Sequence, residues 1–255
     1  MLKMFDKLVA KYYNQNMELK DYEMSLKMAC DYAGITMTDE MTRRFERYYE
    51  LLVDWNEKIN LTAITEQKDV YLKHFADSVY GARYIKQNAT LCDIGTGAGF
   101  PALVLKIVRP DINLTLVDAL EKRIKFLNIV VEELGLIGVQ TLHFRAEDKA
   151  FKDKFLNGFD VVTARAVAKM NTLSEYCLPF VKIGGHFLAY KSDKIQDELD
   201  ESKKAILMLG GGKIDIKTYN LDEETTRTIV DVSKIKNTDK KYPRDKNKPK
   251  LQPIC

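Results

Sequence analysis

Three glycines at alternate positions, Gly95, Gly97 and Gly99, have a spacing that could serve a bound ligand. They follow a short apolar run that begins at Leu91, and the sequence LCDIGTGAGFP predicts a strand, a glycine loop and then a helix. Because glycine has no side chain, a flat or charged ligand can approach the backbone of such a loop closely. A glycine triplet alone also occurs in ordinary turns, so the neighbouring residues have to decide.

The residues around this loop indicate which ligand it would hold. A second apolar run, at positions 112–117, ends in Asp118, and a carboxylate there can accept hydrogen bonds from both hydroxyls of a ribose. A dinucleotide-binding loop has the spacing G-x-G-x-x-G, whereas Phe100 occupies the position of the last glycine here. The loop resembles that of the class I methyltransferases, which bind S-adenosylmethionine, and favours that cofactor over a nicotinamide dinucleotide.

Two further predicted strands lead to polar residues. The run 139–144 is followed by Ala146 and Glu147, and the run 159–163 is followed by Arg165. The carboxyl ends of parallel strands meet at one edge of a sheet, where ligands bind. We therefore expect Ala146, Glu147 and Arg165 to lie beside the cofactor.

His74 and Asp77 lie three residues apart, on one face of a helix predicted after the loop 60–65. A single histidine on a helix is more often structural than catalytic. These two residues are candidates for lining the active cleft, and the structural interpretation stays open beside that one.

The remaining elements complete an α/β fold. Apolar periodicity predicts helices at 1–13, 22–32, 38–59, 121–134 and 193–209, a turn at 179–185, and strands at 186–191, 213–219 and 227–236. The helix at 38–59 has one apolar stripe, formed by Met41, Phe45, Tyr48, Leu52, Trp55 and Ile59, which should pack on the main domain. This order predicts a Rossmann-like, seven-stranded and mostly parallel sheet. We assign residues 1–65 to a helical extension, 66–236 to the main domain and 237–255 to a basic tail.

The composition excludes several classes of protein. The 255 residues contain 45% hydrophobic residues, carry a net charge of +3, and include four cysteines without a C-x-x-C pair and three scattered histidines. That pattern argues against structural zinc, so we expect no metal, and it favours a reduced, cytoplasmic protein. No apolar run of about 18 residues is present, so we expect no membrane span. We also expect a monomer.

The stretch 234–250 contains eight lysines or arginines against two aspartates. Such a segment is either a solvated, partly disordered end or a surface that contacts RNA phosphates by displacing their counterions. On the second interpretation the RNA-binding residues are Lys241, Arg244, Lys246, Lys248 and Lys250.

Several motifs in one order resemble a known family, the bacterial small-subunit ribosomal RNA guanine-N7 methyltransferases, also called glucose-inhibited division protein B. The matching pieces are YYELLVDWNEKINLTAIT, H-x-x-D-S, DIGTGAGFP, VDALEKR, FRAED, TARAVA and KIKNTDKKYPR, and they cover nearly all of residues 38–254. The family's tail usually continues YPRKPGTP, whereas this chain has YPRDKNKP.

The resemblance implies an enzyme that methylates N7 of a guanine in 16S ribosomal RNA, with the RNA or the small ribosomal subunit as its partner. It also implies S-adenosylmethionine contacts by Gly95, Phe100, Ala146, Glu147 and Arg165. Guanine N7 has a free lone pair, so direct in-line displacement needs no general base, and we name no catalytic residue. The alternatives are a methyltransferase for another acceptor, a nicotinamide-dependent oxidoreductase, and a non-enzymatic RNA-binding module.

Overall fold

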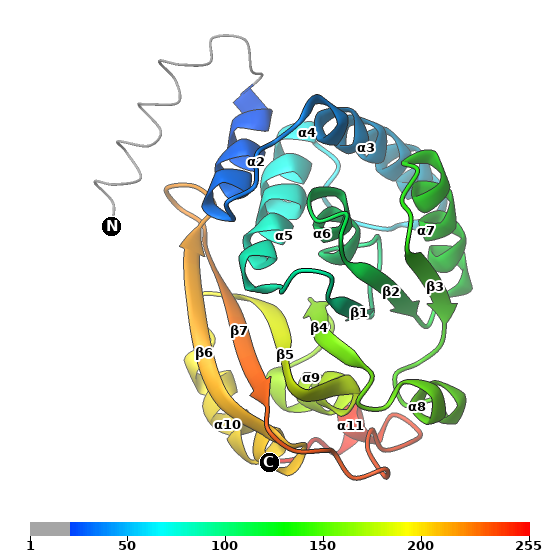
Figure 1. Cartoon of the computed structure of the whole chain (residues 1–255), viewed down its shortest axis with the longest axis vertical. Helices are drawn as coiled ribbons and strands as arrows, with labels where there is room; N and C mark the ends of the chain where they lie inside the picture. Colours follow the sequence, from blue (N-terminus) through cyan, green and yellow to red (C-terminus); the bar gives the residue numbers. More distant parts are fainter. Residues whose placement is uncertain (1–20) are drawn as a thin grey trace.

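One sheet of seven strands lies at the centre of the computed structural model, which describes residues 21–255 (Figure 1). The strands are β1 (Thr90–Ile94), β2 (Asn113–Asp118), β3 (Val139–His143), β4 (Phe159–Arg165), β5 (Val181–Ser192), β6 (Gly211–Asn220) and β7 (Thr226–Lys234). Their order is β3-β2-β1-β4-β5-β7-β6; the first five are parallel, and β7 is antiparallel to both of its neighbours. The predicted seven-stranded, mostly parallel fold is confirmed. The helix predicted at 1–13 lies outside the described residues.

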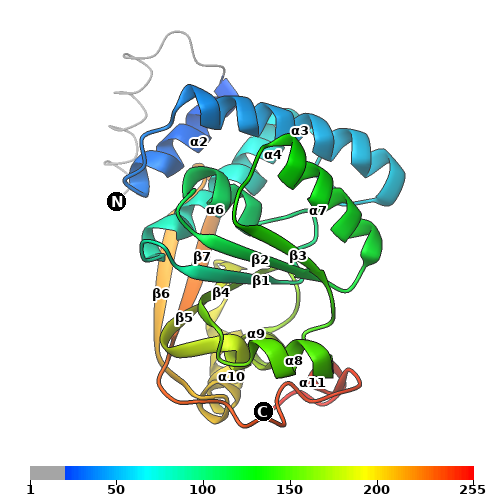
Figure 2. The same cartoon turned by 45° about the vertical axis from the view of Figure 1, so that its right-hand side comes forward.

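Helices cover both faces of the sheet, as Figures 1 and 2 show. One layer contains α2 (Asp21–Tyr32), α3 (Asp39–Ile59), α4 (Gln67–Val70), the π-helix Tyr71–Ala76, α5 (Asp77–Val79), the 3-10 helix Tyr80–Tyr84, α6 (Ala102–Val108) and α7 (Glu121–Glu133). The other contains α8 (Lys149–Phe155), α9 (Met170–Cys177), the 3-10 helix Leu178–Phe180, α10 (Gln196–Met208) and α11 (Lys248–Leu251). Each layer buries its own apolar cluster against the sheet. None of the helices within residues 21–255 has the length and apolar character that crossing a membrane requires.

The helix α3 packs as its apolar stripe predicts. Its first turn is capped by Thr38, whose hydroxyl accepts a hydrogen bond from the Met41 amide at 3.3 Å. It ends at Asn60, which adopts the left-handed conformation with a φ of +51°. Trp55 packs against Phe126 of α7, with ring centroids 5.9 Å apart. Three members of the stripe are fully buried: Phe45, Tyr48 and Leu52.

The predicted turn at 179–185 is wrong from residue 181 onward, because β5 already begins at Val181. Val181 is fully buried and pairs with Phe159 of β4, and the register then shifts before pairing resumes between Val161 and His186. The intervening residues, which include Gly184 with a φ of +81°, form an irregularity inside the strand. The apolar side chain of Val181 thus outweighs the turn character of the glycines.

The C-terminal segment 237–255 packs along the second helical layer. Tyr242 and Ile254 are buried in the apolar cluster of that layer, and α11 contacts α9. Thr238 is also buried. The solvated, disordered end considered from the sequence is therefore not what the structure places here.

Candidate active site

The glycine loop joins β1 to α6 at the carboxyl edge of the parallel strands. All three glycines have positive φ, and a Cβ on Gly99 would lie 2.5 Å from the Tyr48 hydroxyl. A Cβ on Gly97 would meet no atom closer than 4.0 Å, because this residue faces open space. The amides of Gly95 and Thr96 both donate to the Val117 carbonyl, at 2.9 and 3.1 Å, which ties the loop to β2.

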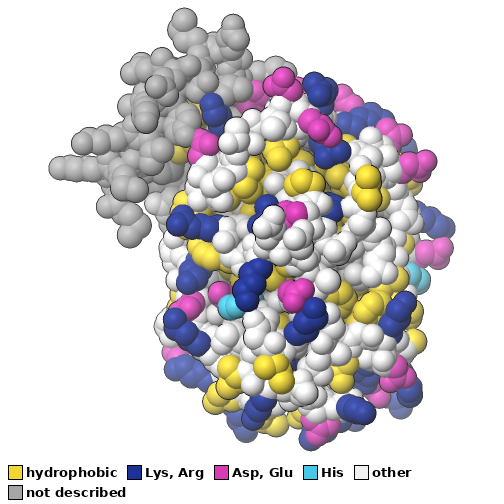
Figure 3. Space-filling model, viewed as in Figure 1, with side chains coloured by type: hydrophobic (Ala, Val, Ile, Leu, Met, Phe, Trp, Pro, Cys, Tyr) yellow, Lys and Arg dark blue, Asp and Glu magenta, His cyan; other side chains and the backbone are white. Residues whose placement is uncertain are grey.

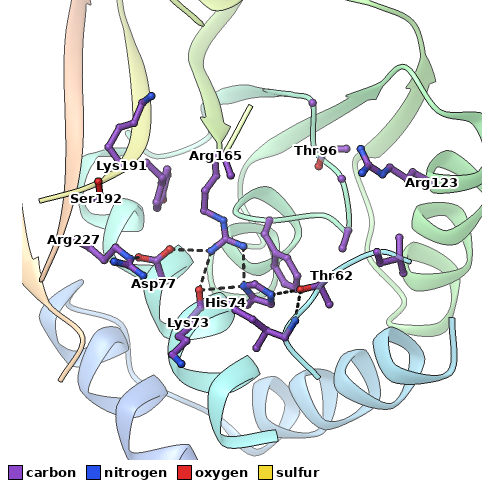
Figure 4. Close-up of a pocket in the computed structure, with 18 residues that line it drawn as sticks. Thr62, Lys73, His74, Asp77, Thr96, Arg123, Arg165, Lys191, Ser192 and Arg227 are labelled. Carbon is purple, nitrogen blue, oxygen red and sulfur yellow. Dashed lines mark hydrogen bonds and ion pairs between the residues drawn. The ribbon is translucent and has the colours of Figure 1, made fainter. Parts of the chain in front are cut away.

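A pocket of about 500 Å³ opens beside this loop (Figure 4). Its lining comes from the glycine loop, from the ends of β4 and β5, from β7, from the first turn of α7, and from the helices and loop that follow α3. The residues are Leu61, Thr62, Ile64, Lys73, His74, Asp77, Gly95, Thr96, Gly97, Ala98, Phe100, Arg123, Arg165, Ala166, Tyr190, Lys191, Ser192 and Arg227.

Arg165, at the end of β4, connects three groups of the helical layer (Figure 4). Its guanidinium donates to Asp77 Oδ2 at 2.9 Å, to the Lys73 carbonyl at 3.2 Å and to His74 Nδ1 at 3.2 Å. The same group lies 5.0 Å above the centre of the Phe100 ring. Strand and helix are therefore locked together at the pocket.

Phe100 forms part of the apolar floor of this network. Its ring stacks on His74, with centroids 4.5 Å apart and 27° between the planes, and on Tyr48 at 5.4 Å. Tyr48 in turn donates a hydrogen bond to the Ala98 carbonyl. The bulky residue that distinguishes this loop from a dinucleotide fingerprint is thus a packing partner of α3 and of the segment that carries His74.

Cations outnumber carboxylates in the pocket lining, although each cation has an acidic partner within 4.0 Å, such as Asp69 for Lys73, Asp118 for Arg123 and Glu198 for Lys191. Five cations line it, namely Lys73, Arg123, Arg165, Lys191 and Arg227, against a single carboxylate, Asp77. That carboxylate is already engaged, since Tyr219 donates to Asp77 Oδ1 at 2.9 Å and Arg227 lies 4.0 Å away, in addition to Arg165. Such a lining suits ligands with negative charge, including a carboxylate or the phosphates of a nucleic acid.

His74 and Tyr190 in the pocket lining, and Asp93 behind the glycine loop, have displaced pKa values, and burial raises that of Tyr190. Burial, followed by the positive charge of Arg165, lowers the pKa of His74 to about 3, so the imidazole is neutral at physiological pH. Burial raises the pKa of Asp93, at the end of β1, to about 7. Asp93 Oδ1 accepts from the Thr163 hydroxyl at 2.6 Å. Asp93 Oδ2 and the Thr96 hydroxyl are buried beside each other, and the Thr96 hydroxyl partly offsets the effect of burial on the pKa of Asp93.

These features fit S-adenosylmethionine. Gly97 leaves room for a ligand against the backbone, and Thr96 of the same loop lines the pocket. Within residues 21–255 no group of three or more His, Cys, Asp or Glu side chains is arranged to hold a metal ion.

The sequence-predicted residues are only partly brought together. Six of them line the pocket: His74, Asp77, Gly95, Gly97, Phe100 and Arg165. Gly99 lies beneath the loop against Leu103 and Tyr48. Ala146 and Glu147 are buried but are absent from the lining, and Glu147 borders a separate pocket with Arg145 and Lys246.

Asp118 is buried behind the glycine loop. It accepts hydrogen bonds from the Gly97 amide and the Leu120 amide, both at 2.9 Å, and from Arg123 at 3.2 Å. The carboxylate thus holds the loop, and its role toward a ribose remains a prediction.

The predicted RNA-binding residues differ from one another in their surroundings. Lys241, Lys246, Lys248 and Lys250 are exposed. Arg244 instead donates to both carboxylate oxygens of Glu175, at 2.8 and 2.7 Å, and Glu175 is fully buried. The guanidinium of Arg244 is therefore engaged in holding the C-terminal segment on α9. Figure 3 shows Lys and Arg side chains spread over this part of the surface rather than gathered in one patch.

Sequence reasoning missed several residues of the lining. Lys191 and Ser192 end β5, so the rule that ligands bind at the carboxyl ends of parallel strands could have found them. Thr62 lies in the NLTAIT loop. Nothing in the sequence of the predicted helical extension indicates that this loop reaches the pocket. Arg227 starts the antiparallel strand β7, for which no such rule exists.

Comparisons with known proteins identify the family of this chain. The family model for rRNA small subunit methyltransferase G (GidB) matches residues 41–229. The chain is 50% identical over 224 residues to "Ribosomal RNA small subunit methyltransferase G" of Geobacillus sp. (strain WCH70), covering 87% of this chain and 94% of that protein. It is 52% identical over 226 residues to the protein of the same name from Leuconostoc mesenteroides, covering 87% and 95%.

Solved structures show the same fold at low identity. TYW2 from M. jannaschii, solved in complex with AdoMet, superposes with a TM-score of 0.51 at 15% identity, over 62% of this chain and 75% of that one. A predicted O-methyltransferase from Agrobacterium tumefaciens superposes with a TM-score of 0.50 at 13% identity, over 60% and 77%. The glycine loop, the cationic pocket and these matches lead to one assignment: the chain belongs to the rRNA small subunit methyltransferase G family.

Proposed function

We propose that this enzyme transfers a methyl group from S-adenosylmethionine to N7 of one guanine in small-subunit ribosomal RNA. The observation that carries the proposal is the pocket beside Gly97, which combines an open glycine loop with five cations and one engaged carboxylate. The glycine loop suits the cofactor, and the cations suit the phosphates of RNA. Membership of the methyltransferase family leaves the nicotinamide-dependent oxidoreductase without support.

S-adenosylmethionine supplies an electrophilic methyl group, which the N7 lone pair of guanine attacks directly while the neutral thioether leaves. N7 has no proton to lose, so the protein does not have to provide a general base. The pocket agrees with this requirement, because His74 has a pKa of about 3 and Asp77 is held by Arg165 and Tyr219. The imidazole is therefore a weak base at neutral pH, and the Asp77 carboxylate is engaged in its two hydrogen bonds.

The residues of the chain then act by positioning. Gly95, Thr96 and Gly97 would hold the cofactor, and Arg165 with Phe100 fixes the adjoining wall. Holding two reactants in line can supply about 7 to 11 kcal/mol of the barrier in favourable cases.

The cations at the pocket would attract the RNA backbone, and the exposed Lys246, Lys248 and Lys250 would add phosphate contacts farther away. Phosphate contacts orient RNA without reading its sequence. We also infer a monomer and a cytoplasmic location; the location is supported by the cysteines, since Cys30, Cys92 and Cys177 are buried and Cys255 exposed as free thiols, as suits a reducing compartment.

The proposal is tested by incubating the enzyme with S-adenosylmethionine labelled on its methyl group and with either small-subunit particles or their naked RNA. We expect label in one of these RNAs, at a single position. The variant Gly97→Val, whose side chain would occupy the space beside the loop, should incorporate none. Label in neither RNA would contradict the proposal and support a small-molecule or protein acceptor.

A further inference from the structure

The hydroxyl of Thr62 lies at the end of a chain of hydrogen bonds that enters the pocket (Figure 4). Thr62 belongs to the loop between α3 and α4 and lines the pocket together with Leu61 and Ile64. Its Oγ1 atom is 3.0 Å from the Ile64 amide, which donates to it, and 2.9 Å from His74 Nε2. If His74 is the donor in this bond, the Thr62 hydroxyl hydrogen is left for a ligand. If His74 is the acceptor, that hydrogen is already used.

The surroundings of His74 favour one direction for that bond. Nδ1 lies 3.2 Å from Arg165 Nη2 and 3.1 Å from the Lys73 carbonyl. A guanidinium can only donate, so a proton on Nδ1 would set two donors against each other. The Lys73 carbonyl accepts from Arg165 Nη1 at 3.2 Å and has a second lone pair, but an N–H on Nδ1 could use it only while also facing the guanidinium. Nδ1 is therefore the acceptor, and since the buried ring is neutral, its one proton is on Nε2.

This tautomer of His74 determines the role of Thr62. His74 Nε2 donates to Oγ1, and so does the Ile64 amide, which together occupy both lone pairs of the hydroxyl oxygen. The hydroxyl hydrogen makes no hydrogen bond to any other described group. Because Thr62 lines the pocket, this hydrogen is available to a ligand there. The side chain is a donor that cannot turn into an acceptor.

We propose that Arg165 and His74 fix Thr62 as a hydrogen-bond donor that recognises O6 of the target guanine. This inference rests on the proposed function, since it concerns the base that is methylated. On the edge that carries N7, guanine presents two acceptors, N7 and O6, whereas adenine carries an amino donor at position 6. A hydroxyl with a free choice of role would accept from adenine as readily as it donates to guanine. With both lone pairs occupied, Thr62 binds guanine and opposes adenine.

The first experiment compares Thr62→Val, which removes the hydroxyl at nearly constant volume, with Thr62→Ser, which keeps it. Each is assayed on small-subunit particles whose target base is guanine or 2-aminopurine, a base that keeps N7 and lacks O6. We expect wild-type kcat/KM to fall by about 5- to 150-fold when O6 is removed, as for the loss of a specific base contact. Thr62→Val should have the same kcat/KM for the two bases, and Thr62→Ser should show the same fall in kcat/KM as the wild type.

Two controls make the result specific. Thr65→Val changes an exposed threonine of the same loop that does not line the pocket, so it should keep the wild-type ratio. Calorimetric titration should give the same affinity for S-adenosylmethionine in Thr62→Val as in the wild type, within about twofold. An unchanged guanine to 2-aminopurine ratio in Thr62→Val would overturn the inference. So would a loss of cofactor affinity that matches the loss of rate, because Thr62 would then serve the cofactor.

The second experiment observes the tautomer of His74 by nitrogen-15 NMR, with the signal assigned by its loss in His74→Gln. We expect the proton on Nε2 and an unprotonated Nδ1; a proton on Nδ1 would break the chain at its centre and overturn the inference. Failure of the proposed function would give a different result, because the wild type would then form no N7-methylated product with guanine. That result would overturn both statements, whereas failure of the Thr62 inference leaves N7 methylation intact.

Discussion

Arg165 Nη1 donates to Asp77 Oδ2 at 2.9 Å and so joins the end of β4 to α5 beside the pocket. Both side chains are largely removed from solvent, with exposed fractions of 14% for Arg165 and 5% for Asp77. In such surroundings an ion pair contributes mainly by fixing geometry, and the loss of one partner leaves an uncompensated charge. The shape of the pocket depends on this pair.

The pair gives a prediction about stability. Asp77→Ala should lower the free energy of unfolding by about 3 to 5 kcal/mol, because Arg165 would stay buried without its carboxylate. The double variant Asp77→Ala, Arg165→Ala should lose less than the sum of the two single changes. Urea denaturation of the four proteins measures both, and strictly additive losses would show that the pair is not coupled.

His74 gives a prediction about pH. Its pKa is about 3 in the folded protein and about 6.5 in the unfolded chain. Its favourable contribution is therefore complete above pH 6.5 and is lost as the pH falls toward 3, since only the unfolded chain binds the proton. Between pH 7 and pH 5 the wild type should lose about 2 kcal/mol more stability than His74→Gln. Stability curves that run parallel over this range would contradict the lowered pKa. His186, present in both proteins, cancels in the comparison.

Asp118 gives a prediction about the cofactor. Asp118→Ala should weaken S-adenosylmethionine binding by about 1.5 to 3 kcal/mol, as the loss of a charged hydrogen bond would. The carboxylate also accepts from the Gly97 amide, so the change loosens the loop as well. Glu121→Ala, at an exposed position on α7, is the matched control and should bind normally. An unchanged calorimetric affinity in Asp118→Ala would refute the assignment.

Much of the fold could be predicted because it depends on patterns that are local in the chain. The stripe from Met41 to Ile59 and the apolar runs before Asp118 and Arg165 each identify one element. The start of β5 could not be predicted, because Val181 follows a proline-containing turn and its pairing with Phe159 is a tertiary contact.

The site was predictable only where the carboxyl ends of parallel strands determine it. Arg165 is an example. The roles of Thr62 and His74 depend on hydrogen bonds across 12 positions of sequence, and those of Arg244 and Glu175 on a contact across 69. Such pairs leave no periodicity. Arg244 was assigned to RNA for its charge alone, and its buried partner on α9 gave no signal in the sequence.

The exposed lysines of the C-terminal segment give a prediction about RNA binding. Replacing Lys246, Lys248 and Lys250 with glutamine should weaken binding similarly for any RNA sequence, because phosphate contacts carry no base information. The log-log dependence of affinity on salt should become shallower by up to about 0.7 to 0.9 for each phosphate that is no longer neutralised. The matched control replaces three exposed lysines on and beside α10, Lys194, Lys203 and Lys204. Equal slopes in the two triple variants would assign the segment to solvent.

The measurement that tests the central claim most directly identifies the methylated atom. Guanine methylated at N7 carries a positive ring that is readily reduced, and aniline then cleaves the strand there, whereas methyl groups on exocyclic nitrogen or ribose oxygen leave it intact. RNA from particles exposed to the enzyme and S-adenosylmethionine should show one new break at a guanine after this treatment. Incorporation of methyl label without a break would mean that the acceptor atom is not N7.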